Sequence, residues 1–302
     1  MKRRRWIQGS AALGLAAAAP LPILERLASA ADARPGGGES APRALHPPAQ
    51  GNIKAAFLLS DGAVIIDFCG PMAVFQAAGT FDTYTVAETS KPIRSGGGMK
   101  ILPDYTFANA PAPNVLVIPA QNTDSPAALD WIRKVTKTTD VTMSVCVGAQ
   151  LLAKTGLLSG KSATTHHNAY KTMAMEFPDV HVKRGARFVE DGNVASAGGL
   201  SSGIDLALHV VERYYGRQTA KDVAFGMEYQ GQGWLNPDSN DVYAQAPVGS
   251  PDHPVCPVCE MEVDTRSPQS VYKGKTYYFC SDDHKKQFDA APEKFLQFES
   301  KP

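Results

Sequence analysis

The chain has 302 residues, and its 30 Lys and Arg residues balance its 30 Asp and Glu residues, so the formal net charge is zero. No basic patch or basic helix is evident beyond the N-terminal segment, which argues against a nucleic-acid-binding protein. Once targeting and linker segments are set aside, about 250 residues remain, enough for one sizeable core and a small extra domain.

The first thirty residues have the layout of an export signal. A basic start at residues 2–5 precedes an apolar stretch at 6–24, and Ala28-Ser29-Ala30 offers a small-residue cleavage site. Residues 3–8 resemble the twin-arginine export motif. The alternative is a retained membrane anchor, although the stretch is short and broken by prolines. We expect a periplasmic or otherwise exported protein, with no stable membrane span after signal cleavage.

Composition divides the remainder into two domains. Residues 31–51 and 236–252 are rich in linker-type residues, including Gly and Pro, and are expected to be linkers. Between them lies a domain at 52–235. A second domain, at 253–300, contains three of the five cysteines.

The domain at 52–235 alternates apolar strands with amphipathic helices. Strands are expected at 55–59, 84–88, 115–119, 141–145, 162–166, 187–189 and 194–196, and helices at 71–78, 126–135, 147–154 and 203–215. This alternation predicts an α/β fold, a doubly wound flavodoxin-like sandwich with a parallel sheet. Asp191-Gly192 predicts a hairpin between the last two strands.

Cys146 lies where a strand is expected to run directly into a helix. Such a turn places the side chain at the carboxyl edge of the sheet, where the N–H groups of the new helix point at it. This geometry predicts a reactive cysteine with a lowered pKa and a site that stabilises an anion. The alternative is a buried, inert cysteine.

Two further side chains are expected at the same edge. Asp67 follows the first strand and opens a helix, and His166 ends the strand at 162–166. An acid, a thiol and an imidazole at three strand ends predict a catalytic site. Asp67 could instead cap its helix, and His166 could be a structural histidine beside the sheet.

These stretches resemble the ThiJ/PfpI superfamily, which has the class I glutamine amidotransferase-like fold, and are most similar to its isonitrile hydratase-like branch. The similarity runs in order through residues 53–216 and is carried by segments at 67–71, 144–149, 156–166 and 197–206. The resemblance implies that Cys146 is the nucleophile, with no cofactor required there, and that Asp67 contacts it and relays protons. In the hydratase branch such a cysteine attacks a small electrophilic carbon, and water completes the addition. Superfamily members often dimerise, so the resemblance also points to a homodimer.

The chain departs from the family pattern at two positions. Val147 stands where peptidase-like members have histidine, so we expect no peptidase activity. Many members have a glycine pair after the strand at 115–119, which supplies a donor to a substrate oxyanion. Here the residues are Ala120 and Gln121, which resist the backbone angles that glycine allows. We place the backbone donors of the site at Val147 and Ala120.

Cys69 lies two residues after Asp67 and could approach Cys146. Under oxidising conditions these two thiols predict a disulfide, or a pair in which one thiol resolves a sulfenate on the other.

The C-terminal domain contains Cys256-x2-Cys259-x20-Cys280-x3-His284. Three thiols and an imidazole at this spacing predict a tetrahedral metal site. Such ligands suit zinc first and copper(I) second. The alternative is a small domain stapled by disulfides. A domain of this size needs a staple, and His284 fits the role of a ligand, which favours the metal.

This small α+β cysteine-rich domain resembles the YHS family, which is related to the metal-binding TRASH domains. The resemblance is carried by residues 256–263, 272–281, Phe288 and 292–295. The resemblance implies that Cys259, Cys280 and His284 are metal ligands. Cys256 matches the family pattern less regularly and is the expected fourth ligand.

Three functions remain open. The first is an exported cysteine-dependent hydratase or lyase that acts on a small electrophilic molecule and carries a metal-binding domain. The second is a non-catalytic protein that senses a ligand, an oxidant or a metal. The third is detoxification of glyoxal-type carbonyls. Regulators of the superfamily carry a helix-turn-helix after the α/β domain, and here the cysteine domain takes that place, which argues against DNA regulation.

Overall fold

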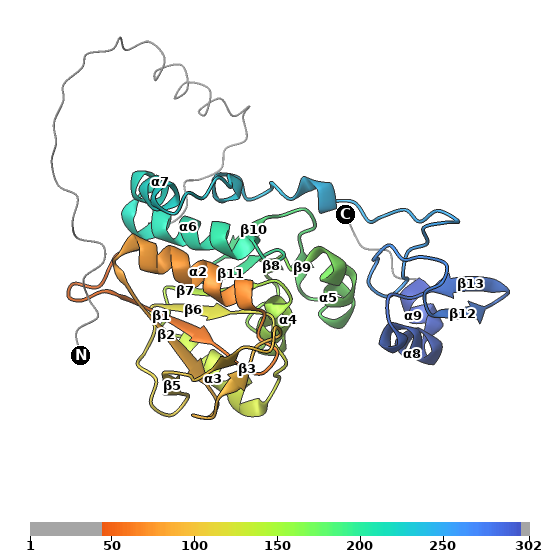
Figure 1. Cartoon of the computed structure of the whole chain (residues 1–302), viewed down its shortest axis with the longest axis horizontal. Helices are drawn as coiled ribbons and strands as arrows, with labels where there is room; N and C mark the ends of the chain where they lie inside the picture. Colours follow the sequence, from red (N-terminus) through yellow and green to blue (C-terminus); the bar gives the residue numbers. More distant parts are fainter. Residues whose placement is uncertain (1–43, 297–302) are drawn as a thin grey trace, which may run out of the picture. The chain divides into compact units, whose positions relative to one another are not determined.

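The structure, a computed structural model, describes residues 44–296 (Figure 1). The expected export signal lies outside the described residues. Within the part that is described, no helix is both long enough and apolar enough to cross a bilayer.

A seven-stranded sheet forms the centre of the α/β domain, in the order β10-β11-β7-β6-β1-β2-β5. Its strands are β1 (Ile53–Leu58), β2 (Phe81–Ala87), β5 (Tyr105–Thr106), β6 (Val115–Ile118), β7 (Val141–Val145), β10 (Phe188–Asp191) and β11 (Val194–Ala197). All neighbours pair in parallel except β10 and β11, which form the predicted hairpin. The parallel, doubly wound architecture predicted from the alternation of elements is confirmed.

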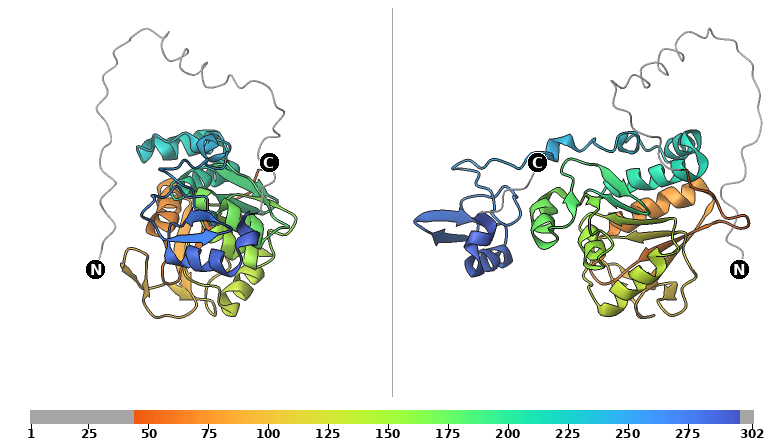
Figure 2. Two further views of the ribbon diagram at one scale, coloured as in Figure 1. Left: turned by 90° about the vertical axis from the view of Figure 1, so that its right-hand side faces the viewer. Right: turned by 180° about the vertical axis from the view of Figure 1, so that it is seen from behind.

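Helices cover both faces of this sheet (Figures 1 and 2). One face packs against α2 (Ile65–Ala78), α6 (Ser202–Tyr215) and α7 (Arg217–Gly226), and the other against α3 (Pro126–Thr136) and α4 (Gly148–Lys154). Successive residues of β1 divide between the two cores: Phe57 belongs to the first and Leu58 to the second. This alternation is the period of a strand that is buried on both sides.

Helix α2 begins six residues earlier than predicted, at Ile65, and includes Pro71. Proline has no backbone N–H, so within a helix it removes one hydrogen bond. Its ring instead packs against α6, where a Cβ atom on Gly203 would lie 3.2 Å from Cγ of Pro71. Close packing of the two helices compensates for the missing donor.

The strand expected at 162–166 is shorter than predicted and lies outside the main sheet. Only β8 (Ser162–Ala163) is extended, and it pairs with β9 (His181–Val182) in a separate two-stranded sheet. The chain then enters the short 3-10 helix η1 (His167–Ala169) and the helix α5 (Tyr170–Glu176). A further two-stranded sheet joins β3 (Ile93–Arg94) and β4 (Lys100–Ile101).

The C-terminal domain is built from a hairpin and two short helices. Strands β12 (Gln269–Tyr272) and β13 (Lys275–Tyr278) are antiparallel, and α8 (Asp282–Ala290) and α9 (Pro292–Leu296) follow. The hairpin turn has positive φ angles at Lys273 and Gly274, as a tight two-residue turn requires. Phe279, Phe288 and Phe295 form its apolar core together with the buried cysteines.

Candidate functional site

Cys146 occupies a strained turn between a strand and a helix. Strand β7 ends at Val145, helix α4 begins at Gly148, and Cys146 has a φ angle of 59°. Positive φ is uncommon for a residue with a side chain and is found at functional sites. The Cys146 N–H donates to Gly198 O at 2.9 Å, and the Thr165 hydroxyl donates to Cys146 O at 3.0 Å. This is the geometry of a nucleophile elbow.

Gly148 allows the elbow to approach the neighbouring strand. A Cβ atom at this position would lie 2.3 Å from the carbonyl oxygen of Ile118, the last residue of β6. The first turn of α4 therefore packs against the end of the sheet without side-chain interference.

Asp67 is the buried acid of the site. Its side chain is on the first turn of α2, where Val64 is the N-cap residue, and it is 0% exposed. Oδ2 accepts a hydrogen bond from the Ala120 N–H at 3.1 Å, whereas Oδ1 is buried and makes no regular hydrogen bond among the described residues. Burial raises the pKa of Asp67 to about 6, and the Ala120 N–H and the Cys146 thiol oppose that shift.

The Cys146 thiol has a raised pKa, so the predicted lowering is wrong. Burial and the negative charge of Asp67 raise the pKa of Cys146 to about 12. The N–H groups of Val147 and Leu200 point at the sulfur and lower its pKa, but by less. Two backbone donors do not outweigh desolvation and a neighbouring carboxylate. At neutral pH the pair is a thiol beside a carboxylate that is able to accept its proton.

Backbone donors at the site differ in part from those expected. The Ala120 N–H is committed to Asp67, so it orients the acid. Val147 does face the sulfur, and the second donor is Leu200, which sequence reasoning missed. Leu200 has a φ angle of 44° and follows the pair Gly198-Gly199 beyond β11. A glycine pair at the end of a strand next to β7 was the signal that could have identified it.

His166 lies against the same loop. It caps η1, its Nδ1 is 2.5 Å from Asn168 Oδ1, and a Cβ atom on Gly199 would lie 2.5 Å from its Cδ2. The neighbouring His167 is exposed and stacks on Tyr243, with ring centroids 4.3 Å apart. The ring of His166 therefore supports the loop that carries the Leu200 donor, and its predicted catalytic role stays a prediction.

Cys69 is a half-buried free thiol on α2, and burial raises its pKa. Cys146 is also free. The disulfide or resolving pair that we expected between them stays a prediction.

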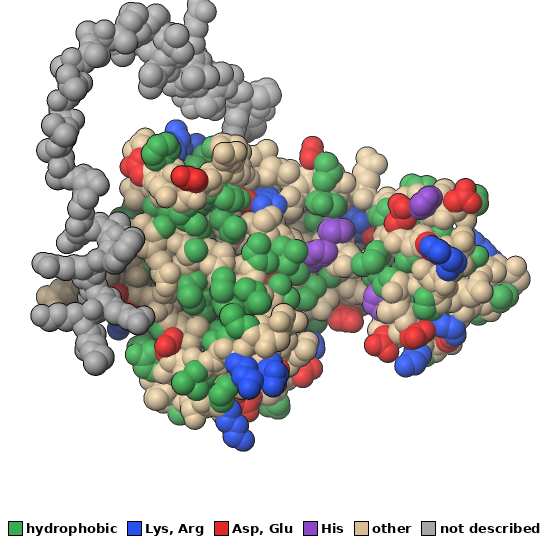
Figure 3. Space-filling model, viewed as in Figure 1, with side chains coloured by type: hydrophobic (Ala, Val, Ile, Leu, Met, Phe, Trp, Pro, Cys, Tyr) green, Lys and Arg blue, Asp and Glu red, His purple; other side chains and the backbone are tan. Residues whose placement is uncertain are grey.

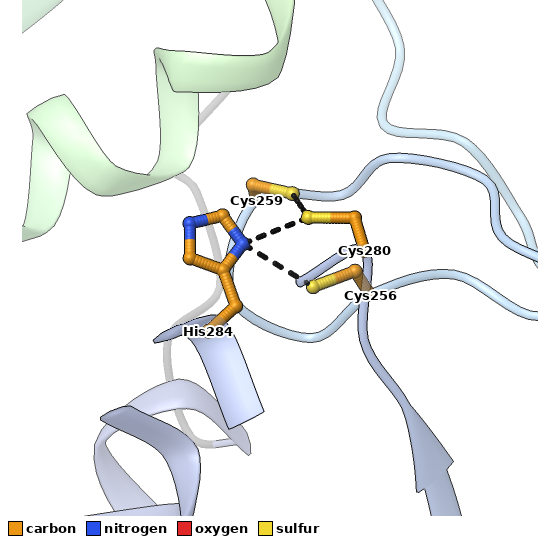
Figure 4. Close-up of side chains that lie close together, drawn as sticks. All are labelled: Cys256, Cys259, Cys280 and His284. Atoms are coloured by element: carbon orange, nitrogen blue, oxygen red, sulfur yellow. Dashed lines mark hydrogen bonds between the residues drawn. The ribbon is translucent and has the colours of Figure 1, made fainter. Parts of the chain in front are cut away.

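The second site is a cluster of Cys256, Cys259, Cys280 and His284, whose ligand atoms all lie within 4.8 Å of one another (Figure 4). The Sγ atoms of Cys259 and Cys280 are 3.5 Å apart, and His284 Nδ1 is 3.8 Å from Cys256 Sγ and 3.0 Å from Cys280 Sγ. Zinc–sulfur bonds of about 2.3 Å in a tetrahedron place sulfur atoms roughly 3.8 Å apart. The donor set and its spacing therefore fit a single metal ion.

Local structure holds the four ligands in place. Cys256 O accepts from the Glu260 N–H at 2.9 Å, and Glu260 has a φ angle of 63°, which closes the turn that contains Cys256 and Cys259. His284 lies on the first turn of α8, where its N–H donates to the Ser281 hydroxyl at 3.2 Å. The Cys259 thiol donates to Cys256 and holds the pKa of Cys256 well below its usual range. All three cysteines are free thiols and converge with the histidine, which favours a metal site over the disulfide alternative.

Two family models match separate parts of the chain. The DJ-1/PfpI family model matches residues 53–213, more than half of the chain, and the YHS domain model matches residues 255–299. The chain belongs to the DJ-1/PfpI family. It carries a YHS domain at its C-terminal side, and that domain contains all four residues of the cysteine and histidine cluster.

Relatives of this DJ-1/PfpI protein include enzymes and regulators. An isonitrile hydratase of Pseudomonas putida is 32% identical over 182 residues, which cover 59% of this chain and 78% of that protein. The transcriptional regulator CdhR of Pseudomonas aeruginosa is 26% identical, over 56% of this chain and 52% of the regulator. A crystal structure of a ThiJ/PfpI family protein from Pseudomonas syringae has a TM-score of 0.56 and 27% identity, over 67% of this chain and 84% of that one.

Proposed function

We propose that this protein is an exported cysteine-dependent hydratase that acts on a small electrophilic molecule, with an isonitrile as the model substrate. The observation that carries the proposal is the buried Asp67 carboxylate, whose Oδ1 makes no regular hydrogen bond among the described residues and which interacts with the thiol of Cys146. A buried, under-satisfied acid beside a nucleophile on an elbow is costly for stability and useful for proton transfer. Similarity to an isonitrile hydratase supports the choice of substrate.

In the first step the Cys146 sulfur attacks the terminal carbon of the isonitrile. The thiol proton passes to Asp67 as the carbon–sulfur bond forms, and Asp67 then delivers that proton to the same carbon. The product of this step is a thioimidate on Cys146. A carboxyl group whose pKa is about 6 is suited to accept and return a proton near neutral pH.

In the second step water attacks the thioimidate carbon, and Asp67 accepts a proton from that water. Asp67 passes this first proton to the substrate nitrogen. It then takes the second water proton from the hydroxyl group of the adduct as the carbonyl forms and the carbon–sulfur bond breaks, and returns that proton to the Cys146 sulfur. The net reaction adds one water to the isonitrile and releases an N-substituted formamide. The N–H groups of Val147 and Leu200 stabilise the sulfur whenever it carries negative charge.

Steady-state turnover tests this proposal. The mature protein is incubated with a simple alkyl isonitrile, and formamide is measured by chromatography. We expect turnover by the wild type and by Cys69→Ala, which removes the thiol on α2, and none by Cys146→Ala. Formamide production by Cys146→Ala at the wild-type rate would refute the assignment of the nucleophile.

For the YHS domain we infer a zinc ion, with copper(I) as the second candidate, because three thiolates and one imidazole form a tetrahedral N/S donor set. Metal analysis of the purified protein tests this inference. One zinc per chain supports it, and a metal-free protein that takes up neither ion contradicts it.

Twin-arginine export to the periplasm is part of the proposal and rests on the sequence of the first thirty residues. N-terminal sequencing of the protein from a periplasmic fraction should begin at Ala31. A full-length chain retained with the membrane would contradict export followed by cleavage.

A homodimer is the oligomeric state that we propose. Hydrophobic side chains gather on the face shown in Figure 3. Separately, Ile66, which precedes Asp67, and Leu200, whose N–H points at the Cys146 sulfur, are 40% and 41% exposed. Light scattering of the mature protein tests this state, and a monomer at micromolar concentration would contradict it.

The second candidate function is a non-catalytic sensor. It is favoured by the raised pKa of Cys146, because a protonated thiol is a weak nucleophile, and by the similarity to a transcriptional regulator. Metal uptake without turnover of any small electrophile would support this candidate over the hydratase.

A further inference from the structure

Two cationic side chains of the α/β domain, Arg184 and Lys171, contact the YHS domain. Arg184, between β9 and β10, pairs with Glu260, and Nη2 is 2.8 Å from Oε2. Both side chains are 14% exposed. Glu260 directly follows Cys259, so this ion pair is formed beside a predicted metal ligand.

The second cation is Lys171 on α5. It is 7% exposed, and its Nζ donates to Phe295 O on α9 at 2.9 Å. Met175, one turn further along α5, packs against the core of the YHS domain. Burial lowers the pKa of Lys171, and the negative charge of Glu260 opposes that shift. Lys171 therefore places a buried cationic side chain at the contact between α5 and the YHS domain.

Arg184 is held rigidly at this contact. Its guanidinium lies over the ring of Tyr170 at 5.0 Å, and its Nε donates to Ala244 O at 3.3 Å. The Tyr170 hydroxyl in turn accepts from the Gly185 N–H at 3.2 Å. A planar guanidinium stacked on an aromatic ring loses little further freedom when it forms an ion pair.

Charge balance indicates what these two cations do. A divalent ion with three thiolates and a neutral imidazole carries one excess negative charge, and Glu260 adds a second. Buried charge is costly unless it is paired. Lys171 and Arg184 supply two positive charges, which match the metal-loaded cluster. When the thiols are protonated and no metal is bound, Glu260 is the one negative charge of this set, and the two cations exceed it by one positive charge.

We propose that Lys171 and Arg184 form an outer electrostatic shell of the YHS metal site, so that metal binding and the contact between α5 and the YHS domain stabilise each other. The proposal rests on the metal-binding part of the function above. Because coupling between two equilibria is reciprocal, metal should order α5, and the two cations should tighten metal binding. Helix α5 follows η1, which His166 caps, and the His166 ring lies near Gly199 beside the Leu200 donor. The contact with the YHS domain is therefore made by a segment that follows directly on a residue near the cysteine site.

Zinc affinity of the full mature chain tests the proposal, measured by competition with a chromophoric chelator. The variants are Lys171→Met and Arg184→Gln, with Lys183→Met as the control, because Lys183 is exposed and precedes Arg184 in the same segment. Outer-shell changes typically weaken a metal site by about 10- to 100-fold. We expect a loss in that range for Lys171→Met and Arg184→Gln and less than about twofold for Lys183→Met.

A second readout does not depend on any variant. Amide hydrogen exchange of α5 in the wild type should slow when Zn²⁺ is added. Unchanged exchange in α5, or equal affinity of Lys171→Met and wild type for Zn²⁺, would overturn the coupling while leaving the metal site intact. A wild-type protein that binds no Zn²⁺ would overturn both the metal function and the coupling.

Discussion

Asp67 and Cys146 form a buried carboxylate–thiol pair at the carboxyl edge of the sheet, and burial raises the pKa of both residues. Ala120 holds one oxygen of the carboxylate through its N–H, and the other oxygen has no regular hydrogen bond among the described residues. The pair therefore retains one proton over a wide pH range. That shared proton is what the proposed chemistry needs to move between sulfur, acid and substrate.

Asp67→Asn should stabilise the protein at alkaline pH while abolishing turnover. A carboxyl pKa of about 6 in the folded state, against 3.8 as the ordinary value, means that the folded state binds the proton more tightly. The free energy of unfolding therefore falls as pH rises from about 4 to 6, and the full penalty is present above pH 6. Removing the charge should recover up to about 3 kcal/mol at pH 8 and little at pH 4. Urea unfolding at the two pH values measures this, and a less stable variant at pH 8 would contradict it.

Alkylation of Cys146 should be slow at neutral pH and should accelerate toward strongly alkaline pH in the wild type. Asp67→Asn removes one of the two causes of the raised pKa, so the alkylation curve should move to lower pH. Peptide mass spectrometry after timed iodoacetamide pulses measures the extent of alkylation at Cys146 and at Cys69, and Cys69 serves as the internal comparison. A wild-type apparent pKa at or below the ordinary value of about 8.5 would contradict this account.

Gly199→Ala should disturb the loop that carries the Leu200 donor. The added methyl group would lie 2.5 Å from Cδ2 of His166, so the ring or the loop must move. We expect a loss of about 1–3 kcal/mol in stability, together with reduced turnover. In a His166→Ala background most of that loss should disappear. Gly226→Ala, whose Cβ atom would have open space, is the control and should stay within about 0.5 kcal/mol of wild type.

Metal removal should destabilise the YHS domain and leave the sheet of the α/β domain folded. The small core around Phe288 depends on the cysteine cluster as its staple. Hydrogen exchange after chelation should rise in β12, β13 and α8, with little change in β1, β6 and β7. Cys256→Ser should reproduce the effect of the chelator, and Cys69→Ser should not. Equal exchange in the apo and loaded forms would contradict a structural role for the metal.

Much of the fold was predictable because buried parallel strands and amphipathic helices leave clear periodicity. The strands at Val115 and Val141 and the helix after Cys146 were found for that reason. The start of α2 was not predictable in this way, because the packing of Pro71 against Gly203 compensates for the backbone N–H that proline lacks. That compensation depends on a helix more than a hundred residues away.

The site was predictable in its residue types and less so in its electrostatics. The elbow at Cys146 and the acid at Asp67 followed from strand ends, and the four members of the metal cluster followed from their spacing. The direction in which the pKa of Cys146 is shifted did not follow from the sequence, because it depends on how deeply the thiol and its acid are buried. Gly198 and Gly199 mark the strand end next to the Leu200 donor, but the positive φ angle that turns the Leu200 N–H toward the sulfur cannot be read from the sequence.

The most direct test of the central claim is intact mass spectrometry of the mature protein, quenched during reaction with an alkyl isonitrile in water labelled with ¹⁸O. The account predicts a covalent adduct of the substrate mass on Cys146, absent in Cys146→Ala, and a formamide that carries one ¹⁸O atom. Unmodified Cys146 at every time point, with no labelled formamide, would contradict the assignment of this protein as a cysteine-dependent hydratase of isonitriles.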